Sequence, residues 1–541
     1  MITLLVALAT LTGALYFYFL HQSRYFARRG MPFVPPASLI FGNSFEMFRK
    51  NEPRILKFRD WTKKYGKTYG IKEGATNLIV TSDLEIVNEV FVKQFDNFYS
   101  RKGAILGPNV DTEPRIHLFL ARGARWKRLR NISAPSFSIA SLKKIRPIVE
   151  DSVLNMVKIM EERHLGGEQF NIHDFYCEYT MDTIGRLVMG QKESLYFNNP
   201  KVPLIKQMFM RDFDLPIVHL RYAFPWITPV LRKILLNVRN HLTAGFMHLR
   251  KEIQDAVEER MRTRCEHKEL NPSSTDVSDF IDLFLNAYED EQEVGVHGEE
   301  FKLSEAKVSK SLTIDEVISQ AFVFILAGFD TTANALAYTS WLLACNPSVM
   351  RKCQEEIEDV CGEEDREVGT RDGRGSNPAV MRKCQEEIED VCGEESISYE
   401  DINNLRYLEA TCKETLRFYP LGAFANSRTD IAVDTFTLHF DEAIWGEDAK
   451  EFKPEREDTK EFGPERWLED RKVQQAAYLP FGAGPRICIG MRLAMMEEKM
   501  ALAHLLRRFD FLKGTEDAEL KVHGALTLTP VEVPIRIVKR Q

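Results

Sequence analysis

Cysteine is scarce in this chain of 541 residues. The nine cysteines are an odd number, they are scattered, and four of them lie in a segment that occurs twice. This pattern does not build the disulfide framework of a small secreted protein, so we expect free thiols in a reducing compartment. The chain also lacks a flavin motif and a Gly-rich dinucleotide motif, which excludes a nicotinamide-binding domain of its own.

The chain has no excess of positive charge. The 72 Lys and Arg residues against 80 Asp and Glu residues give a formal net charge of −8. Proteins that bind nucleic acid through its phosphates usually carry a basic surface, so we expect no nucleic acid partner. The length is nevertheless sufficient to bury a core large enough for a cofactor.

An uncharged apolar stretch, residues 2–20, begins the chain, and Arg24, Arg28 and Arg29 follow it. Its length approaches the ~20 residues that a helix needs to cross a bilayer. The positive flank predicts that the downstream part is cytosolic. A cleaved signal peptide is the competing interpretation, but it normally has a basic first segment and a shorter apolar core. We therefore expect a membrane anchor over residues 1–23, a basic and proline-rich hinge over 24–43, and a single large domain over 44–541.

The most specific motif lies over residues 481–490, which read F-G-A-G-P-R-I-C-I-G. Its glycines allow a tight turn, and a helical pattern over residues 491–509 follows at once. Unpaired N–H groups at a helix start favour a thiolate at Cys488, and Arg486 adds positive charge. Such a thiolate suits the ligation of haem iron, with the arginine on a propionate. The alternative is a buried structural cysteine.

This motif, F-G-x-G-x-R-x-C-x-G, resembles the haem-ligating loop of the cytochrome P-450 superfamily, and the resemblance covers nearly the whole chain. It implies a mostly α fold with a small β-rich part, an N-terminal transmembrane helix, and haem b between a long central helix and the helix after Cys488. Cys488 would ligate the iron. The resemblance further implies that the haem is bound by Trp126, Arg130, Arg428, Phe481, Arg486 and Gly490, with the tryptophan and the arginines on its propionates.

Trp126 and Arg130 lie in a basic stretch, residues 122–130, at a spacing that places them on one helix face. The alternative is an ordinary solvated basic helix. The cations off that face, Arg125, Lys127 and Arg128, are expected to meet an acidic electron-donor protein.

A long apolar run over residues 318–344 could be taken for a second membrane span. Asp330 and Asn334 near its middle make insertion costly, so we expect a buried central helix. Residues 327–332 read A-G-F-D-T-T and resemble the oxygen-activation motif of the superfamily. In this motif Thr331 would pass a proton and Asp330 would resupply it.

Residues 346–364 recur as residues 377–395, and only Ser348 against Ala379 differs. The superfamily has one such helix, so the two copies compete for one groove. We expect the second copy to dock, because it runs directly into residues 396–404.

Glu414 and Arg417 are three residues apart and resemble the E-x-x-R pair of the superfamily. A second arginine should complete this network. Arg456 and Arg466 are both candidates, and Arg466 is favoured because Trp467 follows it. In this chain the stretch between residues 428 and 441 is shortened. Members of the superfamily usually have a longer stretch here, which forms two strands.

The resemblance, which is strongest to animal microsomal members, implies a haem-dependent monooxygenase. It would insert one atom of O2 into a small lipophilic substrate, such as a xenobiotic, a steroid or a fatty-acid-like molecule. Electrons would come from NADPH through a separate flavoprotein reductase, with a small haem protein as a second possible donor. The implied location is the endoplasmic reticulum membrane, with one span in lipid and a cytosolic catalytic domain.

Two alternatives stay open. One is a haem-thiolate isomerase or dehydratase that uses no O2, against which the Asp330–Thr331 pair argues. The other is an inactive pseudoenzyme, which the duplicated helix and the shortened strand region favour.

Overall fold

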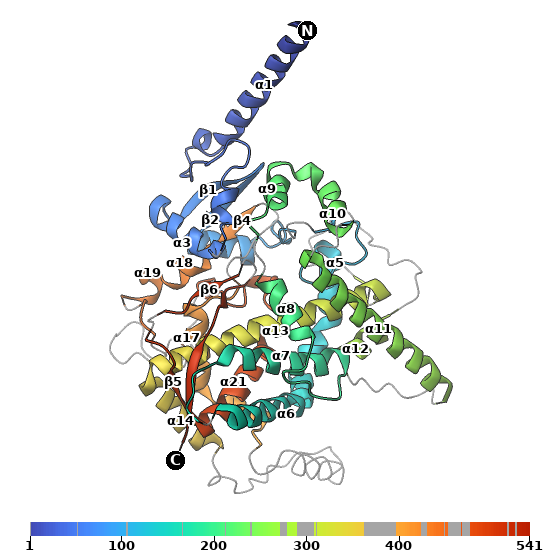
Figure 1. The fold of residues 1–541 in the computed structure, drawn as a ribbon, viewed down its shortest axis with the longest axis vertical. Coiled ribbons are helices and arrows are strands. Elements are labelled where there is room, and N and C mark those ends of the chain that lie inside the picture. Colours follow the sequence, from blue (N-terminus) through green and yellow to red (C-terminus); the bar gives the residue numbers. More distant parts are fainter. Residues whose placement is uncertain are drawn as a thin grey trace.

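The computed structural model describes residues 2–50, 52–103, 107–164, 166–210, 213–237, 241–270, 279–288, 308–309, 311–361, 396–422, 430–447, 449–452, 467, 476–516, 519–524 and 527–540. These residues form a mostly helical body with three small sheets (Figure 1). The predicted fold class is confirmed.

The helices follow the chain from the anchor to the C-terminal region. They are α1 (Ile2–Ser23), α2 (Ser44–Met47), α3 (Arg54–Tyr65), α4 (Leu84–Asn88), α5 (Gly123–Ser133), α6 (Ile139–His164), α7 (Ile172–Met189), α8 (Lys201–Phe209), α9 (Pro216–Ala223), α10 (Thr228–Asn237), α11 (His241–Leu270), α12 (Phe280–Asn286), α13 (Ile314–Cys345), α14 (Pro347–Cys361), α16 (Tyr399–Asn404), α17 (Arg406–Phe418), α18 (Thr435–His439), α19 (Glu442–Trp445) and α21 (Met491–Arg508).

Three sheets are described. The first has the order β1 (Thr68–Glu73), β2 (Thr76–Thr81) and β4 (Ile431–Val433), with β1 antiparallel and β4 parallel to β2. The second has the order β3 (Phe170–Asn171), β8 (Pro534–Lys539) and β5 (Phe509–Lys513), and β6 (Val522–His523) pairs with β7 (Thr529–Pro530). In the shortened region α18 follows the three-residue strand β4 after a single residue.

Helix α13 crosses the middle of the body (Figure 1). Thr313 and Glu316 form a capping box at its start, which satisfies N–H groups that have no partner inside the helix. Although α13 is apolar enough to span a membrane, 72% of its apolar window is buried inside the protein. It is therefore a core helix, as its central Asp330 and Asn334 predict.

Helix α1 extends away from the body, and its apolar window is fully exposed (Figure 1). The segment after it is attached to β1: the Val34 N–H donates to the Gly70 carbonyl over 2.9 Å, and the Gly70 N–H donates to the Pro32 carbonyl over 2.8 Å. Phe26 packs so closely against Gly70 that a Cβ there would lie 2.3 Å from its ring. The anchor is therefore joined to the body by a segment that is bonded and packed against it.

The first copy of the repeated segment forms α14 and is docked. Its Met350, Cys353, Gln354 and Ile357 are buried. The Gln354 amide donates to Asp510 over 2.8 Å, and the Glu356 carboxylate accepts the N–H groups of Tyr407 and Leu408 at the start of α17 over 2.6 and 2.9 Å.

The expectation that the second copy docks is therefore wrong. The first copy continues directly from α13 through Asn346, whose amide donates to the Leu342 carbonyl over 2.8 Å. The second copy lies outside the described residues.

Candidate active site

The cysteine loop is shaped by two glycines in the left-handed region, Gly482 with φ of 76° and Gly484 with φ of 65°. A Cβ at Gly484 would lie 1.9 Å from the Phe91 carbonyl oxygen, so only glycine fits there. The Cys488 N–H donates to the Phe481 carbonyl over 2.8 Å. This bond closes the loop and places the thiol just before α21.

The Cys488 thiol is exposed, and yet desolvation by surrounding protein raises its pKa. A side chain that is both accessible and surrounded faces an opening within the protein. The N–H groups of Gly490 and Met491 and the guanidinium groups of Arg101 and Arg130 oppose the rise, because each of them favours the thiolate.

Three guanidinium groups gather beside this thiol: Arg101, Arg130 and Arg486, which we call the arginine cluster. Arg130 donates to the Ile487 carbonyl over 2.6 Å, and Arg101 donates to the Arg486 carbonyl over 3.1 Å. Burial, and then mutual repulsion, lowers the pKa of Arg486 to about 9, and burial also lowers the pKa of Arg101 to about 10. The Arg486 guanidinium lies 4.8 Å from the centre of the Trp126 ring, so the predicted tryptophan belongs to the same site.

The arginine cluster is not neutralised by acids. Within the described part of the chain none of the three arginines forms an ion pair with a carboxylate, and the buried Nε of Arg486 has no hydrogen-bond partner. Buried cations without anions are costly. The donors of this cluster fit a ligand with two carboxylates beside the Cys488 thiolate, and the two propionates of haem meet that description.

No group of three or more His, Cys, Asp or Glu side chains that could hold a metal occurs in the described residues. Arg428 lies outside the described residues.

Arg101 was missed by the sequence analysis. It stands in a stretch without helical or strand periodicity, at no fixed spacing from Cys488, and only the folded chain brings the two together. The single signal in the sequence is the basic pair formed with Lys102.

One stripe of α13 is accessible in an otherwise buried helix. Ala327 is exposed, and Val323, Gly328 and Thr331 are half-buried. The Thr331 hydroxyl donates to the Ala327 carbonyl over 2.7 Å. Ala327 leaves space on the helix surface at this point, whereas a Cβ at Gly328 would lie 2.8 Å from the Ile184 side chain, so this glycine allows α7 to pack closely against α13.

Asp330 lies to the side of that stripe and is 4% exposed. It accepts hydrogen bonds from Thr527 over 2.6 Å and from Asn334 over 3.0 Å, and no bond joins it to Thr331. Burial raises the pKa of Asp330 to about 7. The proton-delivery roles of Asp330 and Thr331 stay predictions.

The predicted E-x-x-R pair is buried and bidentate, with Arg417 donating to both oxygens of Glu414 over 2.8 and 3.0 Å. Arg417 also donates to the carbonyls of His439 over 2.8 Å and Ala449 over 2.6 Å. The Trp467 indole donates to Glu414 over 3.4 Å. Both candidates for the completing arginine, Arg456 and Arg466, lie outside the described residues.

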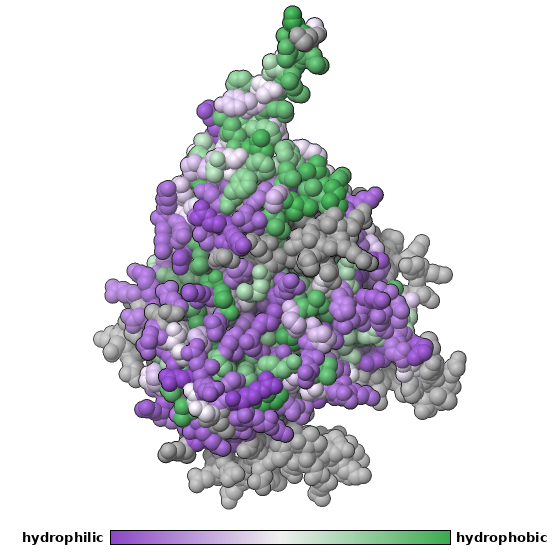
Figure 2. Space-filling model, in the orientation of Figure 1, coloured by the Kyte–Doolittle hydropathy of each residue, from purple (hydrophilic) through white to green (hydrophobic). Residues whose placement is uncertain are grey.

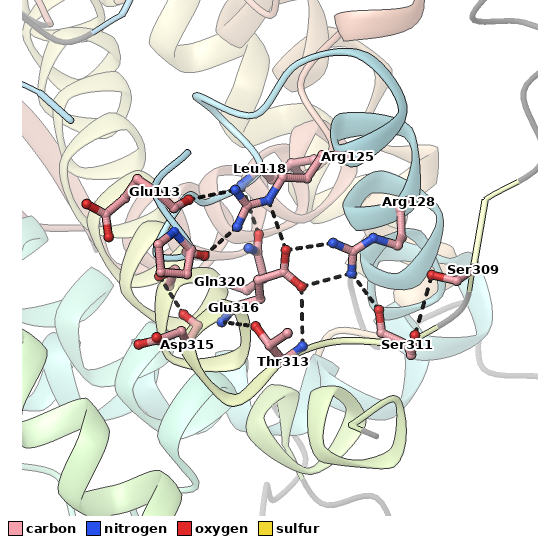
Figure 3. A network of polar contacts seen from close by, with 12 residues as sticks. Glu113, Leu118, Arg125, Arg128, Ser309, Ser311, Thr313, Asp315, Glu316 and Gln320 are labelled. Atoms are coloured by element: carbon pink, nitrogen blue, oxygen red, sulfur yellow. Dashed lines mark hydrogen bonds and ion pairs between the residues drawn. The ribbon is translucent and has the colours of Figure 1, made fainter. Parts of the chain in front are cut away.

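Arg125 and Arg128 face the inside of the molecule, contrary to the prediction that they meet an electron donor. Arg128 donates to both oxygens of Glu316 over 2.6 and 2.8 Å, and Arg125 donates to Glu316 over 2.9 Å (Figure 3). Arg125 also binds the Glu113 carbonyl over 2.7 Å. These arginines attach α5 and the preceding loop to the start of α13, so their charges are not free for a partner.

Comparisons with known proteins agree with this site. The family model described as Cytochrome P450 matches residues 32–372 and 375–535. Among curated proteins of Caenorhabditis elegans, the chain is 39% identical to "Putative cytochrome P450 CYP13A10", with 100% of both chains covered. It is 38% identical to "Putative cytochrome P450 cyp-13B1", with 100% of this chain and 99% of the relative covered. The geometry of the cysteine loop and these matches lead to one conclusion: the chain belongs to the cytochrome P450 family.

Proposed function

We propose that this protein is a membrane-bound haem-thiolate monooxygenase that oxidises a small lipophilic substrate. Family membership supports a haem-dependent oxidoreductase in general. The observation that carries the proposal is the arginine cluster beside the accessible Cys488 thiol, to which the described residues offer no acid.

In this proposal Cys488 binds the haem iron, and Arg101, Arg130 and Arg486 bind the propionates, with Trp126 packed against Arg486. The haem, when bound, supplies the activation of O2. The residues of the chain supply the rest: the N–H groups of Gly490 and Met491 favour the thiolate, and Thr331 holds a proton on the accessible stripe of α13.

The proposed attachment of the protein to the membrane is supported by two apolar features. Helix α1 is long and apolar enough to span a bilayer. Figure 2 shows a second hydrophobic area on the same end of the body, and α9 and α10 lie there in Figure 1. Trp226, Val230 and Ile234 are 70%, 60% and 50% exposed in this region. Such exposed apolar residues mark a membrane contact, which gives access to lipid-dissolved substrates.

The electron source in the proposal is NADPH, through a separate flavoprotein reductase at the endoplasmic reticulum. It is supported by the lack of a dinucleotide motif in the chain. The substrate would be xenobiotic, steroid or fatty-acid-like.

The deciding experiment is the absorbance spectrum of the reduced, CO-bound protein expressed with its anchor. A red-shifted band supports thiolate-ligated haem, and its absence indicates the pseudoenzyme alternative. Turnover with NADPH, reductase and 18O2 then separates the two catalytic alternatives, because a monooxygenase places 18O in the product. An isomerase or dehydratase forms its product without O2.

A further inference from the structure

Asp330 needs a source of protons other than its neighbour in the sequence. Consecutive residues of a helix point about 100° apart, and the Thr331 hydroxyl is engaged with the Ala327 carbonyl. Asp330 is instead turned toward the β6–β7 hairpin and α7. If Asp330 is to give up protons repeatedly, the groups in that direction must replace them.

The contacts of Asp330 are few. Its Oδ2 accepts one bond from the Thr527 hydroxyl over 2.6 Å and one from the Asn334 amide over 3.0 Å. Asn334 also donates to Thr529 over 3.2 Å, and its oxygen lies 2.9 Å from Nε2 of His173. The hydroxyl oxygens of Thr527 and Thr529 are 3.3 Å apart. These residues join α13, α7 and the β6–β7 hairpin in one buried polar group.

Of the two residues that bond Asp330, Thr527 and Asn334, only Thr527 is suited to proton transfer. The Asn334 amide holds its protons firmly, so His173 behind it is not connected to Asp330 by a usable path. A hydroxyl both donates and accepts. Thr527 is half-buried while Thr529 is buried, so the Thr527 side chain reaches from the carboxyl toward solvent.

Other titratable groups act on Asp330 only through space. They are Cys177 of α7, Lys206 of α8 and Tyr338 of α13, and His173 of α7 lies behind Asn334. Desolvation lowers the pKa of His173 to about 4 and raises the pKa of Cys177, so both are neutral near pH 7. None of these four groups offers Asp330 a hydrogen-bonded proton.

We propose that Thr527 is a positioning residue that supplies protons to Asp330. The Thr527 O–H gives its proton to Oδ2 of the Asp330 carboxylate and takes another from a water molecule on the exposed side of the hairpin. At the Thr527 oxygen one O–H bond breaks and one forms, Oδ2 of Asp330 gains an O–H bond, and the water loses one, so the net transfer is one proton from solvent to Asp330. This inference rests on the proposed monooxygenase function, in which Asp330 resupplies Thr331.

The first test titrates the Asp330 carboxyl in the purified ferric holoprotein by difference infrared spectroscopy. The Asp330→Asn variant identifies the carbonyl band. Loss of the hydroxyl in Thr527→Val should raise the pKa of Asp330 from about 7 to about 8, because a bond to the charged form is removed. Thr527→Ser should restore the titration. The matched control is Thr529→Val, which removes a hydroxyl that bonds Asn334 and not Asp330.

The second test measures product and peroxide per NADPH. Thr527→Val should lower coupling about tenfold, which is less than the full 10²–10⁴-fold contribution of a general acid because Thr527 acts through Asp330, and Thr527→Ser should recover it. An unchanged infrared titration in Thr527→Val, or an equal change in Thr529→Val, overturns the proposal. A shifted titration with wild-type coupling also overturns it, since the proton would then arrive by another route. If the wild type makes no oxygenated product, the proposed function fails, and the infrared titration still decides whether Thr527 controls Asp330.

Discussion

Among the buried arginines of the described residues, Arg417 and Arg486 differ most clearly in what surrounds them. Arg417 is fully buried, and all its guanidinium nitrogens donate, to both Glu414 oxygens and to the carbonyls of His439, Ala449 and Glu451. Arg486 is also buried, but the described residues offer it carbonyls and no acid, and its Nε is unpaired. Two other arginines repel it.

This difference indicates that Arg417 belongs to the structural framework and Arg486 to a ligand-binding site. A buried charge that is paired inside the chain stabilises the fold by staying paired, whereas buried charges without partners destabilise the protein until an anion arrives. The first arrangement predicts loss of folding on mutation. The second predicts loss of haem, with a fold that is unharmed or more stable. The following tests are ordered by the expected size of the effect.

The comparison requires haem at Cys488, so Cys488→Ser should have the largest effect. A hydroxyl does not ionise near neutral pH and does not replace the thiolate. We expect the red-shifted band of the reduced CO complex to disappear completely. A variant that keeps the band would show that another residue ligates the iron and that the arginine cluster serves a different ligand.

Arg417→Met should strongly destabilise the apoprotein, because Glu414 would be left buried without a counter-charge. Breaking such a pair costs about 3–5 kcal/mol. Urea unfolding of the haem-free protein gives this free energy. The matched control is Lys413→Met, one turn of α17 away, which removes a partly exposed pair with Glu409 worth less than about 1 kcal/mol. Equal losses of unfolding free energy in Arg417→Met and Lys413→Met would show that the buried pair stabilises the fold no more than an exposed one.

Arg486→Met should act in the opposite direction on the apoprotein. Removing a repelled and desolvated cation should leave the free energy of unfolding unchanged or higher. Haem affinity should fall by a factor of about 30 or more, since one partner of a buried charge pair is lost, at about 2 kcal/mol or above. Haem transfer to apomyoglobin measures this affinity. Destabilised apoprotein with unchanged haem retention would place Arg486 in the framework instead.

Acid should destabilise the folded state through His439, which lies beside Arg417. Its Nε2 accepts the Leu479 N–H over 2.9 Å and its Nδ1 lies 3.2 Å from the Arg417 carbonyl, so the ring is held neutral with the proton on Nδ1. Burial, and then the Arg417 charge, lowers the pKa of His439 to about 3. Below about pH 6.5 the unfolded state takes up a proton that the folded state refuses, and stability falls until pH 3.

The expected loss from His439 is about 1.4 kcal/mol per pH unit in that window. Unfolding free energies of the wild type at pH 6, 5.5 and 5 should show a slope that is steeper than that of His439→Gln by about this amount. Parallel slopes would mean that other histidines whose pKa burial lowers, such as His117, His173 and His504, carry the acid sensitivity.

The smallest effect should come from deleting residues 346–376, which touches neither group of arginines. The deletion joins Cys345 to Asn377 and gives the second copy the same connection to α13 that docks the first. Because only Ser348 against Ala379 differs, thermal stability and haem content should stay the same or rise. A deletion protein that loses haem would show that residues 346–376 cannot be replaced by their near-identical copy.

Local motifs predicted much of the site. Spacing predicted that Trp126 and Arg130 share a helix face and that Arg486 lies beside Cys488, because these are local properties. The resemblance implied that the two motifs meet, and they do. The sequence also identified α13 as a core helix from two polar residues. Predictions failed where tertiary contacts decide: Arg125 and Arg128 bind Glu316, almost 200 residues further along the chain, and no periodicity encodes that pairing.

Two further points depended on the folded chain. Arg101 has no motif, and its place beside Cys488 depends on a loop that packs across the cysteine loop. The competition between the repeated copies could not be decided by packing, since their buried residues are identical. In the structure the first copy, which adjoins α13 with no loop between them, occupies the groove.

The bonded segment between α1 and β1 has a consequence for how substrates are found. With Val34 and Pro32 bonded to Gly70 and Phe26 packed against it, the segment that follows α1 is held to the body. Under the proposed membrane attachment, this restricts tumbling of the body and keeps the apolar surface of α9 and α10 near the membrane. A lipophilic molecule dissolved in the bilayer then meets the protein by lateral diffusion alone, so the search for substrate takes place in two dimensions instead of three.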